Sequence, residues 1–310
     1  MHYPTVGIFD YFYKIYFDKC HFDIPGWQVL PDNIDLKDQS PDVFLQINLQ
    51  KHSNRNSLKL EDLLYKFIKD SGKQILVCES TPFRKNLTNL VETDQIYYRL
   101  GWNHYLRSGN FNNKKSPSDR WKKIQQDQCI EIKPWKHNKN GYILLCLQKP
   151  LDSSLNTLYQ QYSNYEHWIA DAIENIRSYT DRHIVVRMHK KRKGLDLSWL
   201  ENYKNVSVSK NVPLKIYEGG ESLQKDFEDA AVVIAYNSNV LVESVCEGIP
   251  SIALDHDSNA WPVCNLLSNI ESPNLNIDRT QWLHNLAYTT WTKEEILNGT
   301  AWEHLRPVYF

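Results

Sequence analysis

The sequence lacks the short motifs that mark several large enzyme classes. Only 11 of its 310 residues are glycine, and no G-x-G-x-x-G, P-loop or G-x-S-x-G motif, zinc-ligand spacing or internal repeat is present. The chain therefore lacks the phosphate-binding loop of nucleotide kinases, the fingerprint of dehydrogenases and the nucleophile turn of serine hydrolases. These three classes are excluded as first interpretations.

Long apolar runs and paired cysteines are also missing. The longest apolar stretches, such as residues 142–147 and 230–236, are too short to span a bilayer, so we expect no stable membrane insertion. No secretory signal follows Met1, and the six cysteines contain no C-x-x-C pair. We therefore expect free thiols and a cytoplasmic protein.

An excess of charge of either sign is absent as well. Lys and Arg total 36, Asp and Glu total 37, and the formal net charge is -1. This balance argues against binding to nucleic acid or to an anionic membrane through bulk charge, although local basic clusters remain.

The pattern of apolar residues predicts two α/β domains. A chain of this length has a prior of two domains at about 150 residues each. Residues 3–9, 43–49 and 74–78 are expected strands, and residues 58–69 are an expected helix. Residues 137–141 form the best linker candidate, which gives an amino-terminal domain at 1–140 and a carboxyl-terminal domain at 141–310.

The second half alternates strands and helices regularly. Expected strands at 142–147, 183–188, 206–208, 231–236 and 250–254 enclose expected helices at 166–179, 222–230 and 239–247. Such alternation predicts a parallel, doubly wound sheet, which places ligands at the carboxyl ends of its strands.

The most informative stretch is AVVIAYNSNVLVESVCEGIPSIAL at residues 231–254. Its strand runs directly into Asn237, Ser238 and Asn239 and then into a helix, whose free N–H groups would suit a phosphate. Glu243 lies one turn inside the helix, where a carboxylate can accept hydrogen bonds from ribose hydroxyls. The competing interpretation is an ordinary solvated helix face with a capping serine.

A basic cluster follows another expected strand, in IVVRMHKKRK at residues 184–193. Arg187, His189 and Lys190 stand at the end of this strand, where they could bind an anionic ligand. The alternative is a basic surface loop.

These residues carry a resemblance to a known family. The R-x-H at Arg187 and His189, the Tyr236-Asn237-Ser238 stretch, Glu243, Gly248 and Pro250 resemble the carboxyl-terminal half of GT-B glycosyltransferases. The likeness is to the capsular-polysaccharide, Kdo-transferase-like branch and to short phage-encoded relatives of it, although Lys190 replaces the proline of the family's R-x-H-P motif. It covers roughly residues 140–290.

The resemblance implies two Rossmann-like domains in a GT-B-like arrangement, with a cleft between them and a nucleotide-sugar held mainly by the second domain. It implies that Asn237, Ser238, Asn239, Arg187, His189 and Lys190 bind phosphate, that Glu243 binds the ribose, and that Ser222 and Leu223 contact the base. The implied reaction is the transfer of a sugar from a nucleotide-activated donor to a hydroxyl group.

Such a transfer needs a base for the acceptor hydroxyl. Asp10, which ends the first expected strand, is the first candidate, and His104 is the second. The surrounding aromatic and basic segment contains Trp102, Arg120 and Trp121, which we place on the acceptor side. A strand-end cap for Asp10 and a packed loop histidine for His104 are the simpler interpretations.

The motif Asp255-His256-Asp257 is the one candidate metal site, because paired carboxylates can hold Mg²⁺ against a diphosphate. The order of elements fits the metal-independent fold better. We therefore expect no metal and no cofactor beyond the nucleotide-sugar.

The sequence does not decide between two kinds of acceptor. Phage-encoded relatives suggest a hydroxymethylated pyrimidine in DNA, in the cytoplasm of an infected bacterium, and lysines interleaved with Trp121 and Trp135 would suit such a strand. Capsule-type relatives suggest a capsule or surface glycan instead. Two alternatives of other classes are a non-catalytic protein that binds nucleotide-sugars or glycans, and a sugar-nucleotide epimerase.

Overall fold

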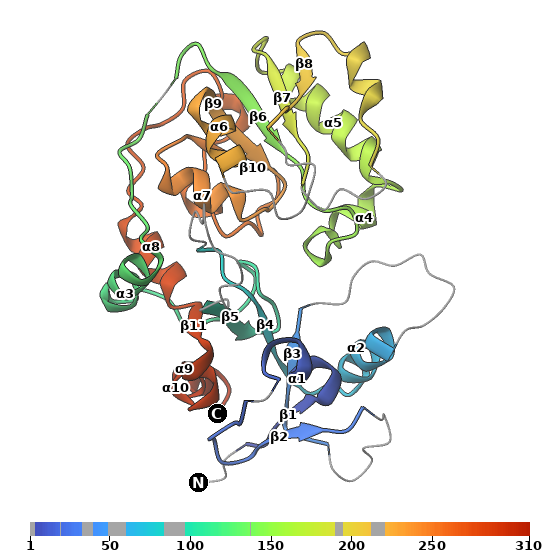
Figure 1. Cartoon of the computed structure of the whole chain (residues 1–310), viewed down its shortest axis with the longest axis vertical. Helices are drawn as coiled ribbons and strands as arrows, with labels where there is room; N and C mark the ends of the chain where they lie inside the picture. Colours follow the sequence, from blue (N-terminus) through green and yellow to red (C-terminus); the bar gives the residue numbers. More distant parts are fainter. Residues whose placement is uncertain are drawn as a thin grey trace. The chain divides into compact units, whose positions relative to one another are not determined.

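The computed structural model describes residues 4–18, 20–32, 40–48, 60–83, 97–136, 138–189, 195–211 and 221–310. The chain forms two compact units (Figure 1). Unit 1 comprises Met1–Thr81, Thr93–Arg120 and His284–Phe310, and unit 2 comprises Pro82–Glu92 and Trp121–Leu283. The predicted boundary between residues 140 and 141 falls inside unit 2 of this division. Two of the points at which the chain passes between the units lie inside helices, in α3 (Asp119–Gln128) and in α8 (Thr280–Ala287).

Unit 1 is built on a six-stranded sheet in the order β11-β5-β4-β3-β1-β2. Its strands are β1 (Val6–Phe9), β2 (Trp27–Leu30), β3 (Val43–Ile47), β4 (Gln74–Ser80), β5 (Tyr97–Trp102) and β11 (Thr290–Thr292). The four strands β2, β1, β3 and β4 pair in parallel, whereas β5 runs antiparallel to both β4 and β11. Every residue of β1 and β3 is buried, as expected for parallel strands covered on both faces.

The helices of unit 1 come from both ends of the chain. They are α1 (Asp10–Tyr16), α2 (Leu60–Asp70), α9 (Lys293–Leu297) and α10 (Thr300–Leu305), followed by a 3₁₀ turn at Arg306–Val308. The predicted helix at 58–69 is confirmed over the described residues of α2. A capping box opens α9, because the side chains of Thr292 and Glu295 each accept from the other residue's backbone N–H, at 3.1 Å and 2.8 Å.

Unit 2 contains a five-stranded sheet in which all strands are parallel, in the order β10-β9-β6-β7-β8. Its strands are β6 (Tyr142–Cys146), β7 (Ile184–Arg187), β8 (Val206–Val208), β9 (Ala230–Ala235) and β10 (Ser251–Ala253). Counted from the first strand of the unit, the order is 3-2-1-4-5, that of nucleotide-binding Rossmann sheets. The predicted α/β fold with two Rossmann-like domains is therefore confirmed, with a fully parallel sheet in unit 2 and one antiparallel strand, β5, in the sheet of unit 1.

The helices of unit 2 connect these strands. They are α4 (Leu158–Gln161), α5 (Tyr165–Arg177), α6 (Glu221–Glu228) and α7 (Val240–Cys246), with 3₁₀ turns at Ser153–Leu155, Ser198–Asn202, Trp261–Val263 and Leu267–Asn269. The apolar stripe of α5, which includes Ile169, Ile173 and Ile176, packs on the sheet. None of the described helices combines the length and apolar character that crossing a membrane requires.

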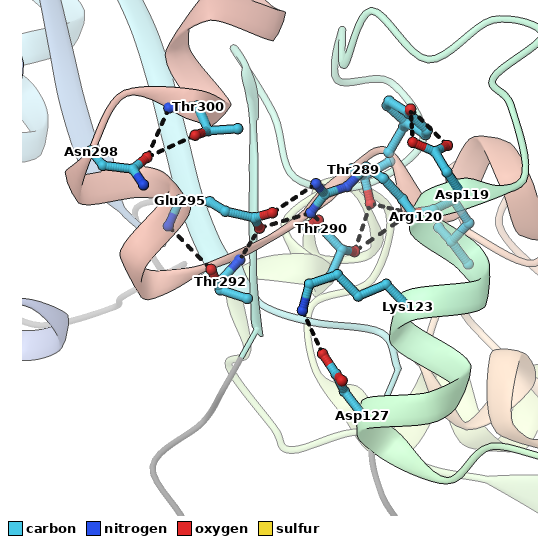
Figure 2. Close-up of polar contacts among 12 residues, drawn as sticks. Asp119, Arg120, Lys123, Asp127, Thr289, Thr290, Thr292, Glu295, Asn298 and Thr300 are labelled. Carbon is cyan, nitrogen blue, oxygen red and sulfur yellow. Dashed lines mark hydrogen bonds and ion pairs between the residues drawn. The ribbon is translucent and has the colours of Figure 1, made fainter.

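A buried arginine ties the carboxyl-terminal segment of unit 1 to α3. Both terminal nitrogens of Arg120 donate to the carboxylate of Glu295, at 3.0 and 2.9 Å, and Nη2 also donates to the carbonyl oxygen of Thr290 at 2.6 Å (Figure 2). The guanidinium lies 3.9 Å from the ring centre of Trp291. Burial by itself raises the pKa of Glu295, but hydrogen bonds from Arg120 and Thr292 outweigh it and hold the pKa below its usual value.

We expect Glu295→Ala to lower the free energy of unfolding by about 3 kcal/mol, because it leaves a buried guanidinium without its carboxylate. The matched control is Glu303→Ala, which removes the carboxylate of the more exposed Arg306–Glu303 pair and should have a much smaller effect. Urea unfolding followed by tryptophan fluorescence measures both. Equal decreases in the free energy of unfolding for the two variants would contradict the stabilising role of the Arg120–Glu295 pair.

Candidate functional site

The strand order of unit 2 identifies one position on its sheet as the candidate ligand site. The chain leaves the central strand β6 first toward β7 and β8, and it later continues on the other side with β9 and β10. Parallel sheets of this type bind ligands beside the carboxyl ends of the two strands between which the order reverses. Gln148 and Asn237 follow these strands, β6 and β9, so they mark the candidate site.

Two buried amide side chains, those of Gln148 and Asn237, bind each other at this position of the sheet. The side chain of Gln148 donates to Asn237 Oδ1 at 2.9 Å and accepts from the Asn237 backbone N–H at 3.1 Å. The Asn237 amide nitrogen donates to the carbonyl oxygen of Ser154 and to Asp255 Oδ2, both at 2.8 Å. Both hydrogens of this amide are thus in use, and only 2% of Asn237 is exposed. The side chain of Asn237 has no donor left for the phosphate that the sequence analysis assigned to it.

Ser238 and Asn239 remain half-exposed at the same edge. Ser238 Oγ accepts from the backbone N–H of Val240 at 3.3 Å, as a capping serine does, although the helix α7 begins only after Asn239. Asn239 Oδ1 accepts from the amide of Asn259 at 3.4 Å. These two residues keep the predicted position beside the carboxyl end of β9.

The predicted basic group is divided by the fold. Arg187, at the end of β7, forms an ion pair with the buried carboxylate of Asp226 on α6. That carboxylate also accepts from Ser209 Oγ, at 2.9 and 2.8 Å, and from Asn211 Nδ2 at 2.7 Å. His189 is half-buried two residues beyond β7, and Lys190 lies outside the described residues. The charge of Arg187 is therefore balanced inside unit 2.

Glu243 lines a small cavity of about 200 Å³ in unit 2. Its walls come from α7 and from two segments before β6, and include Phe83, Lys133 and Glu247, the last two joined by an ion pair of 2.5 Å. A carboxylate on the wall of such a cavity could accept hydrogen bonds from a diol. Of the described residues that line it, none comes from α6, so Leu223 is not brought to Glu243; the side chain of Ser222 lies outside the description.

A larger hollow of about 840 Å³ lies at the opposite, amino-terminal edge of the same sheet. It is lined by residues that precede β6 and β7, among them Arg182 and His183, and by Arg177 at the end of α5. Arg177 and Arg182 donate to backbone carbonyl oxygens of the surrounding loops. We interpret this hollow as a loop-stabilising polar cluster rather than the candidate site, because parallel sheets of this type bind ligands at their carboxyl edge.

The D-x-D motif is turned partly inward. Asp255 is 6% exposed, and its two oxygens accept from the Asn237 amide at 2.8 Å and from the Asp257 backbone N–H at 3.0 Å. In the part of the chain that the structure describes, no three Asp, Glu, His or Cys side chains gather as a metal site would require. Asp255 thus belongs to the same buried hydrogen-bond network as Asn237.

Asp10 and His104 lie at opposite edges of the unit 1 sheet. Asp10 follows β1 at the carboxyl end of the parallel strands and is paired with Lys14 one turn later. Because β5 is antiparallel, its last residue, Trp102, pairs with Leu76 near the start of β4. His104 therefore lies at the amino-terminal edge, where Nδ1 accepts from a backbone N–H. The sequence analysis treated the two as alternatives at one site, and antiparallel pairing corrects that.

The three predicted acceptor-side residues are buried. Trp102 has no exposed surface, and its Nε1 donates to the carbonyl oxygen of Leu305 at 2.9 Å. Trp121 is 6% exposed and packs on Phe83, with ring centres 5.2 Å apart. Arg120 is held by Glu295 as described above. These side chains offer little surface to an acceptor.

Part of the segment in which lysines are interleaved with Trp121 and Trp135 is likewise engaged within the fold. Lys123 pairs with Asp127 at 2.7 Å and Lys133 with Glu247. Trp135 donates to a backbone carbonyl oxygen and is covered by the guanidinium of Arg279, 4.2 Å from its ring centre. The aromatic rings that would stack on a base are thus engaged within the fold.

Sequence reasoning missed Glu79. It ended the expected strand at residue 78, whereas β4 continues to Ser80, which makes Glu79 a half-buried carboxylate at the carboxyl edge of the unit 1 sheet. Its Oε1 accepts from the backbone N–H of Ser80 at 2.7 Å and from the Ser80 hydroxyl at 2.9 Å. An acidic residue directly after an apolar strand was the signal that could have found it.

Comparison with solved structures finds the same fold elsewhere. The beta Kdo 2,4 transferase of Thermosulfurimonas dismutans KpsC superposes with a TM-score of 0.50 and 10% identity, over 93% of this chain and 91% of that one. The beta Kdo 2,7 transferase of the same KpsC gives a TM-score of 0.51 and 11% identity, over 98% and 99%. The chain has the fold of these transferases. By sequence, no family model and no curated protein matches it.

We expect Asn237→Ala to lower the free energy of unfolding by roughly 2 kcal/mol, because it leaves buried hydrogen-bonding groups on Gln148 and Asp255 without partners. Ser238→Ala, at the adjacent half-exposed position, should leave thermal stability nearly unchanged. Differential scanning calorimetry of both variants measures this. If Asn237→Ala were as stable as the wild type, the structural role of Asn237 would be wrong, and Asn237 would again be a candidate ligand-binding residue.

Proposed function

We propose that this chain is a glycosyltransferase that moves a sugar from a nucleotide-activated donor to a hydroxyl acceptor. The observation that carries the proposal is the 3-2-1-4-5 parallel sheet of unit 2, in a chain whose fold matches Kdo transferases over almost its whole length. The sheet order supports nucleotide binding at the carboxyl edge. Because both neighbours are named as Kdo transferases, a nucleotide-activated Kdo is the first donor to test.

On the donor side, three of the predicted residues keep a suitable position. Ser238 and His189 lie beyond the carboxyl ends of β9 and β7, and Glu243 faces the cavity of about 200 Å³. We assign Ser238 and His189 to the donor phosphate and Glu243 to the ribose diol. Asn237 and Arg187 shape this edge through their buried partners rather than by direct contact.

For the acceptor, the glycan interpretation is favoured over hydroxymethylated DNA. A DNA strand would need exposed aromatic rings and unpaired basic groups, whereas Trp121 and Trp135 are packed and Lys123 and Lys133 form ion pairs. The Kdo transferases of similar fold favour a hydroxyl group of a glycan.

The proposal predicts that a nucleotide-activated donor stabilises the protein thermally and is turned over. Glu243→Gln should weaken donor binding by roughly 10- to 100-fold, the range for losing hydrogen bonds to a charged group. Glu228→Gln, an exposed position on α6, is the matched control. Calorimetric titration and mass spectrometry of glycan products provide the measurements. Donor binding without transfer or donor hydrolysis would instead identify a binding protein, and interconversion of the donor without acceptor an epimerase.

We further propose that turnover does not need a divalent metal, because both oxygens of Asp255 already accept hydrogen bonds within the protein. Activity should therefore survive EDTA, and Asp257→Asn should retain most of it. Steady-state rates with and without chelator measure this. Loss of activity in EDTA, restored by Mg²⁺ or Mn²⁺, would establish a metal-dependent reaction.

A further inference from the structure

The hollow of about 840 Å³ at the amino-terminal edge of the unit 2 sheet has the size of a ligand site. Its lining residues come from 139–142 at the start of β6, from 177–183 between the end of α5 and the start of β7, and from position 271. All of them belong to unit 2. They share no residue with the lining of the cavity beside Glu243, so the two are separate features of one unit.

A guanidinium and a carboxylate form one wall of this hollow. Arg182 Nε donates to Glu271 Oε2 at 2.8 Å, and the other oxygen of Glu271 accepts from the hydroxyl of Thr180. Arg182 Nη1 also donates to the carbonyl oxygens of Lys139 and Gly141, at 2.6 and 3.2 Å. These contacts fix a donor group and an acceptor group side by side. Sugar hydroxyls need both, because each hydroxyl donates one hydrogen bond and accepts others.

Arg177 adds a second guanidinium, which is held by carbonyl oxygens. Its Nη1 donates to the carbonyl oxygens of Thr180 and Arg182, at 3.0 and 2.8 Å, and its Nη2 donates to that of Asn205 at 3.2 Å. Among the described residues, no carboxylate pairs with Arg177, and its Nε and the second hydrogen of Nη2 have no acceptor. The group is thus fixed in position while its charge can still attract an anion.

The charges on the lining favour one class of ligand. Lys139, Arg177 and Arg182 stand against Asp181 and Glu271, so three positive and two negative charges leave an excess of one positive charge. Nucleic acid is held by several cations at once, and this excess is too small for it. A glycan that carries carboxylates at intervals fits better, because guanidinium groups bind carboxylates through paired hydrogen bonds.

An aromatic ring is exposed beside these polar groups. Tyr179 lines the hollow, is 46% exposed, and donates its backbone N–H to the carbonyl oxygen of Ile176 at 3.0 Å. A tyrosine ring combines apolar faces with a polar hydroxyl. A sugar ring likewise has apolar C–H faces and polar edges, so an exposed tyrosine beside fixed polar side chains is complementary to it.

We propose that this hollow is a second, non-catalytic site that binds a glycan whose sugars carry carboxylates. Tyr179 packs against a sugar ring, Arg182 and Glu271 hydrogen-bond its hydroxyls, and Arg177 and Lys139 attract its carboxylate. The hydrogen bonds that stabilise the loops also fix most of these groups before the glycan arrives, which lowers the entropic cost of binding. The proposal goes beyond the transfer reaction, because binding at this edge needs no donor.

The experiment measures glycan binding to the full chain by isothermal titration calorimetry, with no nucleotide-sugar present. The probes are hexagalacturonate, in which every sugar carries a carboxylate, and maltohexaose, a neutral chain of the same length. Hexagalacturonate should bind more tightly, and Tyr179→Ala should weaken its binding by about 10-fold through loss of the aromatic contact. The matched control is Leu151→Ala, because Leu151 is 45% exposed in the same unit but does not line the hollow. Its affinity should equal that of the wild type.

Two further variants separate the contribution of the ring from that of charge. Tyr179→Phe keeps the ring and should bind hexagalacturonate like the wild type, which also guards against a folding defect at this position. Lys139→Gln removes one charge, so it should weaken hexagalacturonate binding by about 3-fold and reduce its dependence on salt. Binding of maltohexaose should not change in Lys139→Gln.

The outcomes distinguish this site from the proposed function. A wild-type protein that does not bind hexagalacturonate, or that binds maltohexaose equally tightly, would overturn the second site and leave the transferase proposal standing. Wild-type affinity in Tyr179→Ala would do the same. A protein that binds hexagalacturonate through Tyr179, but neither binds nor transfers any nucleotide-sugar, would overturn the proposed function and support the second site.

Discussion

Parallel strand pairing decides where almost every functional candidate in this chain lies. A parallel strand cannot return through a tight turn, so each strand of unit 2 is followed by a crossover, and the carboxyl ends share one edge. Polar residues that follow these strands therefore collect in one place, although they are far apart in the sequence. In unit 1 the same rule holds from β1 to β4 and fails at β5. That single reversal sends the residues after Trp102 to the far edge and separates His104 from Asp10.

The elements of unit 2 could be predicted closely because each is defined by its own apolar pattern. The expected strand at 231–236 is β9 at Ala230–Ala235, and the expected helix at 239–247 is α7 at Val240–Cys246. In unit 1, β5 was missed because its sequence, YYRLGW, contains an arginine and a glycine. Arg99 can be buried there only because carbonyl oxygens of Ser80 and Tyr105 receive its guanidinium, and no local pattern records those partners.

The carboxyl edge of the unit 2 sheet could be located from the sequence, but the contacts of each side chain at that edge could not. Asn237, Arg187 and Arg120 are residue types that serve ligands and internal networks equally well. The partner decides between the two roles, and it stands 89, 39 and 175 positions away, at Gln148, Asp226 and Glu295. A buried polar group without a hydrogen-bond partner lowers the stability of the fold, so these side chains find their partners within the protein. Glu79 was overlooked for the converse reason, since the sequence ended its strand one residue early.

The pairing of β11 with β5 also has a consequence for the order in which the chain can fold. Unit 2 consists of two segments inserted within unit 1, and the Trp102 indole meets its acceptor, Leu305, 203 positions later. During synthesis, unit 2 can complete its sheet while that of unit 1 still lacks a strand. The outer edge of β5 stays open until residues 290–292 emerge from the ribosome, and an open edge can pair with a strand of another chain.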